Sequence, residues 1–341
     1  MKVLFCCNAD SIVGFGHLRR CLILAEEVRS RRNQVSFEGD FAPAARELIT
    51  RSNFKIMKKG HTESFDAGLL DWMFDSENMD HYEPSLISNF ASSCERSVLL
   101  SSSVDIPDDL PVDLVIGYVL SPPATPSFSC LSSLKFAPVP PGWEEKRNLG
   151  RKISSEIGKV LMAFGAWKDE TPLIKTLEGL KSFGFSGAMD CLLAHPHRKS
   201  KERFLEVAED CFSIQFHEEV PDVGKLLVEN DLVVGGYGNL TYEALALGTP
   251  FLCVPLKRFQ FEYARTLEEK GLLCLLDLAD DLSSERIATS LGELDYDQRK
   301  LLASNGMSAI DVQGLGRVVD ALLAKGQIER KETQLAGNNL N

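Results

Sequence analysis

The sequence predicts an α/β protein of two domains, each built around a parallel β-sheet. Three observations support this fold class. Short apolar segments alternate with segments of helical periodicity, the alternation restarts after a proline-rich stretch, and 341 residues suffice for two domains of ordinary size. Two such domains joined by a linker typically bind a ligand in a cleft between them, outside the carboxyl ends of the strands.

The first domain opens with a strand, a helix and a second strand. Residues 3–7 (VLFCC) are apolar, apolar residues recur at helical spacing from Leu18 until the basic stretch RSRRN, and residues 34–40 (QVSFEGD) read as the next strand. This order predicts parallel strands joined by a right-handed crossover. Further strands are predicted at 97–103 and 112–119. Between residue 60 and the strand at 97–103, the pattern predicts no particular helix or strand.

A proline-rich segment then separates the two halves of the chain. Eight of the fifteen prolines lie between residues 107 and 141, which excludes long helices there, and FAPVPPGWEEKRNLG is typical of an interdomain linker. We therefore predict an N-terminal α/β domain over 1–142, a linker over 143–155, a C-terminal α/β domain over 156–328 and a polar tail over 329–341.

The second domain repeats the alternation. A strand predicted at 159–165 is followed by a helix at 171–183 and a strand at 189–196. Further elements are predicted at 213–219, 223–230, 231–238, 240–248 and 249–256, before an amphipathic stretch from Phe261 to Lys270.

Composition excludes several classes of function. The formal net charge of −12 disfavours nucleic acid and anionic membranes as partners. The nine cysteines are scattered without metal-ligand spacing, so we expect reduced thiols and no metal site. No run of eighteen apolar residues and no signal-peptide cleavage site is present, and we expect a cytoplasmic protein without stable membrane insertion.

The most informative segment is DLVVGGYGNLTYEALALG, from residue 231. A strand ends here in a run of glycines, and a helix begins near Leu240 or Thr241. Glycine lets the backbone approach a ligand, and a helix N-terminus attracts anions, so the segment predicts a diphosphate site. Its candidate residues are Gly236, Tyr237, Gly238, Asn239, Leu240 and Thr241, with Glu243 in the first helical turn as a ribose ligand. The alternative is a tight turn in which Glu243 only complements the helix dipole.

A second glycine-rich turn, SIVGFGHLRR at residues 11–20, follows the first strand. Gly14 and Gly16 precede a helix that begins near His17, which places the imidazole at the carboxyl edge of the sheet. The positive end of the helix favours a neutral imidazole, which can act as a general base. The alternatives are that His17 only hydrogen-bonds the preceding loop and that Arg20 is a solvated or structural charge. The third glycine of the dinucleotide fingerprint is missing, so no nicotinamide or other cofactor is predicted.

These residues also resemble a known family. ADSIVGFGHLRRCLILA is similar to the A-D-x-S-x-x-I-G-x-G-H-x-x-R-C-L-x-L-A signature of the UDP-2,4-diacetamido-2,4,6-trideoxy-β-L-altropyranose hydrolases of pseudaminic acid synthesis and of related spore-coat polysaccharide proteins. The resemblance continues through FAPVPPGW, VLMAFGAWKD and DVQGLGRVVDALL and covers most of the chain. The segment 235–250 is also similar to the lipid II N-acetylglucosaminyltransferase and other glycosyltransferases of the GT-B fold.

The resemblance implies a GT-B fold, two Rossmann-like domains with parallel sheets facing across a cleft, in which the C-terminal domain holds most of a UDP-sugar and no metal is required. It implies that His17 activates a water that attacks the anomeric carbon and displaces UDP, and that Glu243 contacts the ribose. The motifs add further substrate-binding candidates, which are Asp10, Gly14, Gly16, Arg20, Gly165 and Gln260.

The chain departs from that family at several positions. Phe259 stands before Gln260 where the hydrolases carry an active-site asparagine, and the family's Gly-Gly-Ser-Asp turn is replaced by residues 165–169, GAWKD. The family's Asp-His-Tyr after a strand matches either 80–82, which no apolar strand precedes, or Asp75. Tyr82 is therefore a substrate-site candidate whose alternative is an ordinary half-buried tyrosine. His195 and His197 lack an acidic partner nearby in the sequence, and His217 lies in a charged turn.

Three functions are consistent with these patterns. The first is a UDP-sugar hydrolase that releases UDP and a free acetamido sugar, which the specific GFGH motif favours. The second is an inverting glycosyltransferase that uses the same base on a hydroxyl acceptor in surface polysaccharide or glycoconjugate synthesis. The third is a nucleotide-sugar binding protein without catalysis. The sequence leaves open the sugar, the acceptor, the pathway and the choice between monomer and homodimer.

Overall fold

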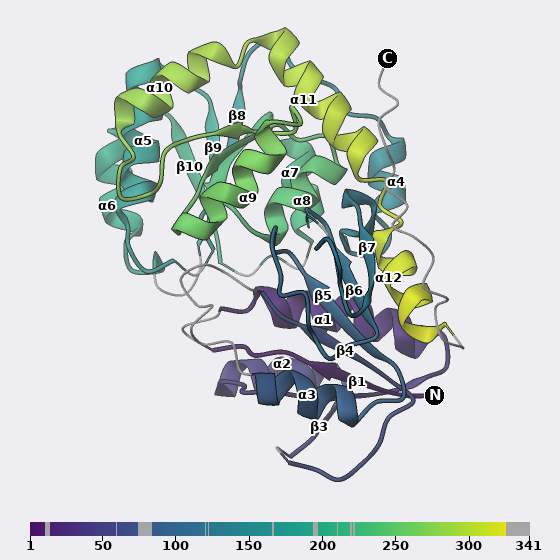
Figure 1. Ribbon diagram of the computed structural model, residues 1–341. Helices are drawn as coiled ribbons and strands as arrows, with labels where there is room; N and C mark the ends of the chain where they lie inside the picture. The colour runs from purple at the N-terminus through teal and green to yellow at the C-terminus, as the bar shows by residue number, and fades with distance from the viewer. Residues whose placement is uncertain are drawn as a thin grey trace. The chain divides into compact units, whose positions relative to one another are not determined.

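The computed structural model divides the chain into two compact units, each with its own parallel sheet (Figure 1). Unit 1 comprises Met1–Pro138 and the chain from Gln313 onward, and unit 2 comprises Val139–Val312. The structure describes residues 1–10, 14–58, 60–73, 84–119, 121, 123–165, 167–193, 197–209, 211–218, 220 and 222–324. None of the helices in these ranges combines the length and hydrophobicity that a membrane-spanning segment needs.

Unit 1 is built on seven parallel strands in the order β3-β2-β1-β4-β5-β6-β7. Their bounds are β1 Lys2–Cys6, β2 Gln34–Glu38, β3 Lys55–Ile56, β4 Ala67–Asp71, β5 Ser97–Ser101, β6 Leu114–Gly117 and β7 Ser129–Ser132. All residues of β4, β5 and β6 are buried, as expected for central strands of a parallel sheet that helices cover on both faces.

The helices of unit 1 are α1 Gly16–Ser30, α2 Pro43–Arg51, α3 Pro84–Ser92 and α12 Gly314–Leu323, with a 3₁₀ turn, η2, at Leu134–Phe136. Helix α1 buries Leu18, Cys21, Leu24, Ala25 and Val28, which recur at helical spacing on the face toward the sheet. The predicted crossover from β1 through α1 to β2 is therefore present, within a few residues of the predicted bounds.

Unit 2 is built on six parallel strands in the order β10-β9-β8-β11-β12-β13. They are β8 Lys159–Ala163, β9 Ala188–Leu192, β10 Ser213–His217, β11 Leu232–Gly236, β12 Phe251–Val254 and β13 Cys274–Leu275. The helices are α4 Trp143–Asn148, α5 Thr171–Phe183, α6 Lys201–Ala208, α7 Val223–Glu229, α8 Asn239–Ala246, α9 Arg258–Glu268, α10 Ser284–Glu293 and α11 Tyr296–Ala309.

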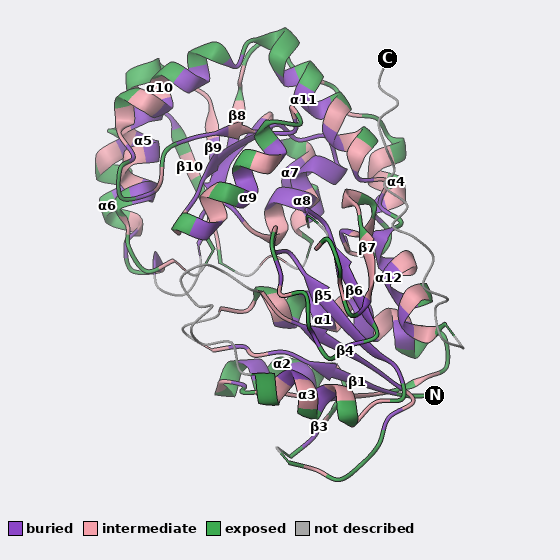
Figure 2. Cartoon of the chain, in the orientation of Figure 1, coloured by how far each residue is buried: buried purple, intermediate pink, exposed green. Residues whose placement is uncertain are grey.

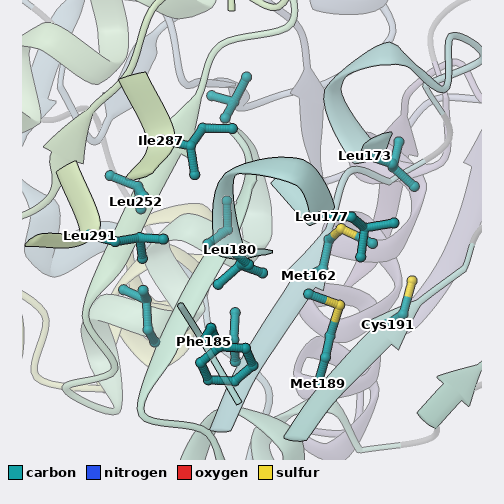
Figure 3. Close-up of a cluster of buried hydrophobic side chains, with 14 of the residues drawn as sticks. Met162, Leu173, Leu177, Leu180, Phe185, Met189, Cys191, Leu252, Ile287 and Leu291 are labelled. Atoms are coloured by element: carbon teal, nitrogen blue, oxygen red, sulfur yellow. The ribbon is translucent and has the colours of Figure 1, made fainter. Parts of the chain in front are cut away.

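Each unit has a core where helices meet its sheet. Figure 2 shows buried central strands, and helices whose outward faces are exposed. In unit 2, Met162 of β8 and Met189 of β9 lie beneath Leu177 and Leu180 of α5, and Ile287 of α10 belongs to the same cluster (Figure 3). These side chains anchor the strands whose carboxyl ends carry the candidate residues of unit 2.

The chain divides differently from the predicted boundaries. Helix α12, expected in the C-terminal domain, packs on α1, β4 and η2 of unit 1, and Arg317 donates to the carbonyl of Lys135 at 2.9 Å. The expected linker instead contains helix α4, which belongs to unit 2. Trp143 is 3% exposed, and Arg147 donates hydrogen bonds to the carbonyls of Ala246 and Ile310. The cause is burial, because α12 and Trp143 each cover apolar surface of the unit they join. The predicted polar tail lies outside the described residues.

We predict that Val318→Ala in α12 destabilises unit 1 specifically. Val318 is completely buried, and its truncation should cost about 2 kcal/mol. Amide hydrogen exchange measured by mass spectrometry should become roughly 30-fold faster in peptides of β1 and β4, with no change in β8 and β11. The matched variant Leu302→Ala, in the core cluster of unit 2, should give the opposite pattern. Loss of protection in β8 after Val318→Ala would contradict the assignment of α12.

Candidate functional site

Both groups of candidate residues lie where the strand order reverses. The reversal falls between β1 and β4 in unit 1 and between β8 and β11 in unit 2. In open parallel sheets ligands bind outside the carboxyl ends of the strands at such a point, because the two following connections leave toward opposite faces. His17 follows β1, Gly165 follows β8, and Gly236 ends β11.

In unit 1 the reversal brings His17 against Asp71. His17 is the second residue of α1 and Asp71 is the last residue of β4, and Nδ1 lies 2.8 Å from Oδ1. The register of the neighbouring strands pairs Cys6 with Leu70, so the loop after β1 and the end of β4 emerge side by side. The Asp71 side chain is completely buried, whereas 11% of the His17 side chain is exposed.

Arg20 holds the other side of the same carboxylate. Its Nε donates to Oδ2 of Asp71 at 2.6 Å, and its Nη2 donates to Oδ1 at 2.5 Å. Arg20 lies one helical turn after His17 and is 6% exposed, so it is a structural charge rather than a solvated one. Burial disfavours the ionised form of Asp71, but the charges and hydrogen bonds of Arg20 and His17 outweigh it and lower the pKa of that carboxyl to about 2.

The ionised Asp71 determines which nitrogen of His17 carries the proton. A carboxylate can only accept hydrogen bonds, so the Nδ1 atom that faces it must be the N–H donor. In the neutral ring Nε2 then carries the free lone pair. A neutral histidine oriented by a carboxylate in this way is the usual form of a general base.

The remaining candidates of unit 1 lie around the same turn or outside the described residues. The Gly14 amide donates to the Asp10 carbonyl at 3.0 Å, and Gly14 has φ 78°, a conformation that favours glycine. Gly16 is the first residue of α1. Tyr82 lies outside the described residues, as do Asp75 and residues 80–81.

Asp71 is not among the residues that the sequence motifs predict, because the motif match indicates Asp75 or Asp80 as the acid of this region. Residues 67–71 (AGLLD) are nevertheless a short apolar run that ends in a carboxylate. That pattern is the available signal, because a polar residue that closes a buried parallel strand lies at the edge where ligands bind. The run is too short for its periodicity to distinguish a strand from a buried turn.

The three glycines at the end of β11 lie in different surroundings, which explain differently why each position is a glycine. A Cβ at Gly235 would lie 2.3 Å from the Ala163 carbonyl oxygen of the adjacent strand β8, and one at Gly236 would lie 2.8 Å from Cδ1 of Leu256. A Cβ at Gly238 meets nothing within 4 Å, and the backbone there is extended. The backbone of β8 therefore requires glycine at position 235, whereas a side chain at 236 would have to displace the end of Leu256. Among the described residues, nothing approaches a Cβ at Gly238.

Helix α8 begins at Asn239, slightly earlier than predicted, with Gly238 as its N-cap. Asn239 and Leu240 are half-buried, whereas Thr241 is completely buried and its Oγ1 accepts from the Gly238 amide at 3.1 Å. Thr241 thus shapes the turn from inside. Glu243 is half-buried and lies just beyond the first helical turn, which contains no acidic residue, so it does not complement the helix dipole there.

Tyr237 and Gln260 support this turn. The Tyr237 side chain is 7% exposed, its hydroxyl bonds that of Tyr242, and burial raises the pKa of its phenol well above the ordinary value. Gln260 accepts from the Leu256 amide at 2.8 Å and donates to the Tyr237 carbonyl at 3.3 Å, which ties the loop before α9 to the glycine turn. The structure therefore turns the Tyr237 side chain inward and not toward a ligand.

Phe259, which stands where the hydrolases carry asparagine, is also buried. It is 5% exposed, and its ring centroid lies 5.6 Å from that of Tyr263, which in turn contacts Tyr237. We call Tyr237, Tyr242, Phe259 and Tyr263 the aromatic cluster. At this position the chain thus has a packing residue and no polar group.

The other positions discussed from sequence are placed as follows. Gly165 is exposed at the carboxyl end of β8 with φ 60°. His197 is buried and its Nε2 donates to the Trp167 carbonyl, which fits the interpretation of a loop residue. His217 pairs with the buried Asp190 of β9 at 2.7 Å, an acidic partner that only the sheet supplies. His195 lies outside the described residues.

No protein-family model matches the sequence. Among curated proteins, an uncharacterized protein of Methanocaldococcus jannaschii is 22% identical over 282 residues, which cover 77% of this chain and 57% of that protein. The match therefore spans little more than half of the relative's length.

Several solved structures have a similar fold, and a glycosyltransferase is among them. MurG of Acinetobacter baumannii has a TM-score of 0.63 at 14% identity and covers 94% of this chain and 98% of its own. LpCGTa in complex with UDP has a TM-score of 0.64 at 15% identity, with 95% and 99% covered. CalG4, the calicheamicin glycosyltransferase, has a TM-score of 0.61 at 13% identity, with 94% and 96% covered. Together with the two parallel-sheet units, these likenesses confirm the GT-B fold class, and at such identities they show the fold alone.

We predict that Asp71 makes stability depend on pH in the acid range. Its pKa in the folded protein, about 2, lies below the ordinary 3.8, so its ionisation stabilises the fold above pH ~4 by about 2 kcal/mol, and this contribution is lost as the pH falls toward 2. Urea unfolding of the wild type and of Asp71→Asn should show a stability difference that shrinks by about 1 kcal/mol between pH ~5 and pH ~3. A difference that stays constant over that range would contradict the ionised pair.

Proposed function

We propose that the protein is a glycosyltransferase-type enzyme that moves a sugar from a uridine diphosphate donor to a hydroxyl acceptor. The observation that carries the proposal is the His17–Asp71 pair at the strand reversal of unit 1, with Nδ1 bound to the carboxylate at 2.8 Å. Support comes from the GT-B fold, because a solved structure of this fold, LpCGTa, holds UDP. Within unit 2, the N-terminus of α8 at Gly238 is suited to an anionic group such as a diphosphate.

The chemistry follows from the protonation state of the pair. Nε2 of His17 removes the proton of the acceptor hydroxyl while the acceptor oxygen attacks the anomeric carbon. The bond between that carbon and the diphosphate oxygen breaks, and its electron pair leaves with UDP. Asp71 keeps its hydrogen bond to Nδ1 and so holds the ring in position while Nε2 takes up the proton. A single displacement of this kind inverts the anomeric configuration.

We assign nucleotide binding to the glycine turn of unit 2. The amides at the start of α8 and the positive end of its dipole suit the diphosphate, whose charge grows as the glycosidic bond breaks. Glu243, one turn along α8 and half-buried, is assigned to the ribose hydroxyls. Gly165, at the end of the adjacent strand β8, leaves room at the same edge of the sheet.

Hydrolysis is the second candidate, and the GFGH motif at residues 14–17 favours it. The same base would then activate water in place of a hydroxyl, and the product would be a free acetamido sugar, as in the pseudaminic acid pathway. Burial of Phe259 in the aromatic cluster weighs against this candidate, because the hydrolases use an asparagine at that position and a buried phenyl ring cannot orient water.

We predict that His17→Gln lowers the release of UDP from UDP-sugars by about 10²-fold or more, because the general base is removed. A panel of UDP-sugars, incubated with and without sugar and small-molecule hydroxyl acceptors, is followed for UDP. His217→Gln is the matched control, since it also removes a histidine paired with a buried aspartate but leaves the rate unchanged.

The arms of this experiment separate the candidate functions. UDP release that requires an acceptor supports transfer, and release without one, abolished by His17→Gln, supports hydrolysis. Tight UDP binding without turnover in any arm, or full activity in His17→Gln, would overturn the proposed enzyme.

We predict that Gly238→Ala weakens UDP binding about tenfold without destabilising the protein, because the new methyl group fills the space above the helix N-terminus. Titration calorimetry measures the affinity, and urea unfolding checks the fold. Gly235→Ala is the contrast: its methyl group meets the Ala163 carbonyl, so it should lower stability. Unchanged UDP affinity in a folded Gly238→Ala variant would show that the diphosphate binds elsewhere.

A further inference from the structure

We propose that Arg20 is a positioning residue: it neutralises the charge of Asp71, which disfavours protonation of His17, and it keeps the imidazole in its orientation. The catalytic consequence rests on the function proposed above, whereas the effect on the His17 proton does not. Sequence resemblance made Arg20 a substrate-binding candidate, but the structure shows its guanidinium directed at the carboxylate behind the base.

The geometry places two donors on one oxygen. Nδ1 of His17 and Nη2 of Arg20 both contact Oδ1 of Asp71, at 2.8 and 2.5 Å, and these two nitrogens lie 3.3 Å apart. Arg20 also occupies Oδ2 through Nε. Because both nitrogens are donors, the 3.3 Å contact is an approach of two groups to a shared acceptor and not a hydrogen bond between them.

Charge counting gives the consequence. A histidine paired with a carboxylate alone gains a full opposite charge when it takes up a proton. Here the guanidinium already neutralises that carboxylate, and protonation of His17 would place two cations within hydrogen-bond distance of one oxygen. Like charges so close and so buried repel strongly, which disfavours the imidazolium. Asp71 therefore orients the imidazole ring of His17 but does not strongly favour its protonated form.

The groups around the pair leave this role to Arg20. On α1 the neighbours are His17 and Cys21, whose Sγ lies 3.8 Å from Oδ2 of Asp71. Cys7, after β1, bonds Cys21, and burial raises the pKa of the Cys21 thiol well above its ordinary value, so Cys21 adds no charge near neutral pH. Beyond β6, the Tyr118 ring lies 5.7 Å from the Arg20 guanidinium carbon. Thiols and a phenol carry no positive charge, so among the described residues around Asp71 the charge that competes with a protonated His17 comes from Arg20.

The placement of Arg20 is fixed by packing as well as charge. Its side chain is 6% exposed, and the aromatic face of Tyr118 favours a flat cation above it. The guanidinium fork spans both oxygens of Asp71, which the single ammonium of a lysine cannot do. Charge and geometry are thus separable by substitution: Arg20→Lys keeps the charge, and Arg20→Gln removes it.

The test follows the His17 imidazole directly by ¹⁵N NMR of histidine-labelled protein, with the signal assigned through His17→Gln. In Arg20→Gln the midpoint pH of the His17 titration should rise by about one unit or more, and in Arg20→Lys it should stay within about half a unit of the wild type. Arg20→Met is a second neutral variant that packs against Tyr118, and circular dichroism confirms the fold of each. A midpoint that does not rise in the folded neutral variants, or that rises equally in Arg20→Lys, overturns the proposal.

Activity supplies the second readout. In the neutral variants the acid limb of the pH profile for UDP release should move to higher pH together with the NMR midpoint, while Arg20→Lys should lower the maximal rate without moving that limb. A purely structural role would lower the rate at every pH and leave the limb in place, which contradicts the proposal. A shifted NMR midpoint in a protein that turns over no UDP-sugar refutes the proposed enzyme alone, and an unshifted midpoint in an active enzyme refutes the role of Arg20 alone.

Discussion

In both units the order of the parallel strands reverses between two neighbours, and the positions of His17, Asp71 and the turn at Gly238 depend on this constraint. Connections that leave adjacent strands toward opposite faces cannot cover the edge between them, so polar side chains and backbone amides can meet there. In unit 1 the edge receives His17 and Asp71, and in unit 2 it receives Gly165 and the turn at Gly238. The same strand reversal thus positions different groups in the two units. Those of unit 1 are suited to moving a proton, and those of unit 2 are suited to holding an anion.

The buried charge of Asp71 imposes the next constraint. A carboxylate at the end of a strand with no exposed residue is costly unless it is paired and hydrogen-bonded. Arg20 and His17 supply both conditions, and they do so from one face of α1, because residues three apart in a helix lie on the same side. The requirement to satisfy Asp71 therefore also orients the imidazole. Stability and the proposed chemistry depend on the same three side chains.

In unit 2, packing and ligand access are divided among adjacent residues. Gly235 and Gly236 let β11 approach β8 and Leu256, and Thr241 closes the turn from beneath. The aromatic cluster and Gln260 fix the turn from behind. Among the described residues, no atom lies within 4 Å of the position that a Cβ of Gly238 would take. A glycine-rich sequence is therefore weak evidence of a ligand site by itself, since contacts with neighbouring protein atoms explain most of these glycines.

The sequence by itself determined the features that depend on local pattern. Periodicity located the first crossover unit and helix α5 at Thr171–Phe183, and the GFGH turn placed His17 at the edge of a sheet. Only the tertiary structure decided which groups meet. Asp71 lies 54 residues from His17, Gly235 is required by a carbonyl on another strand, and α12 packs on a unit that begins more than 300 residues earlier. The reason is physical: hydrogen bonds, close approach and burial join residues by distance in space, and separation along the chain carries no record of them.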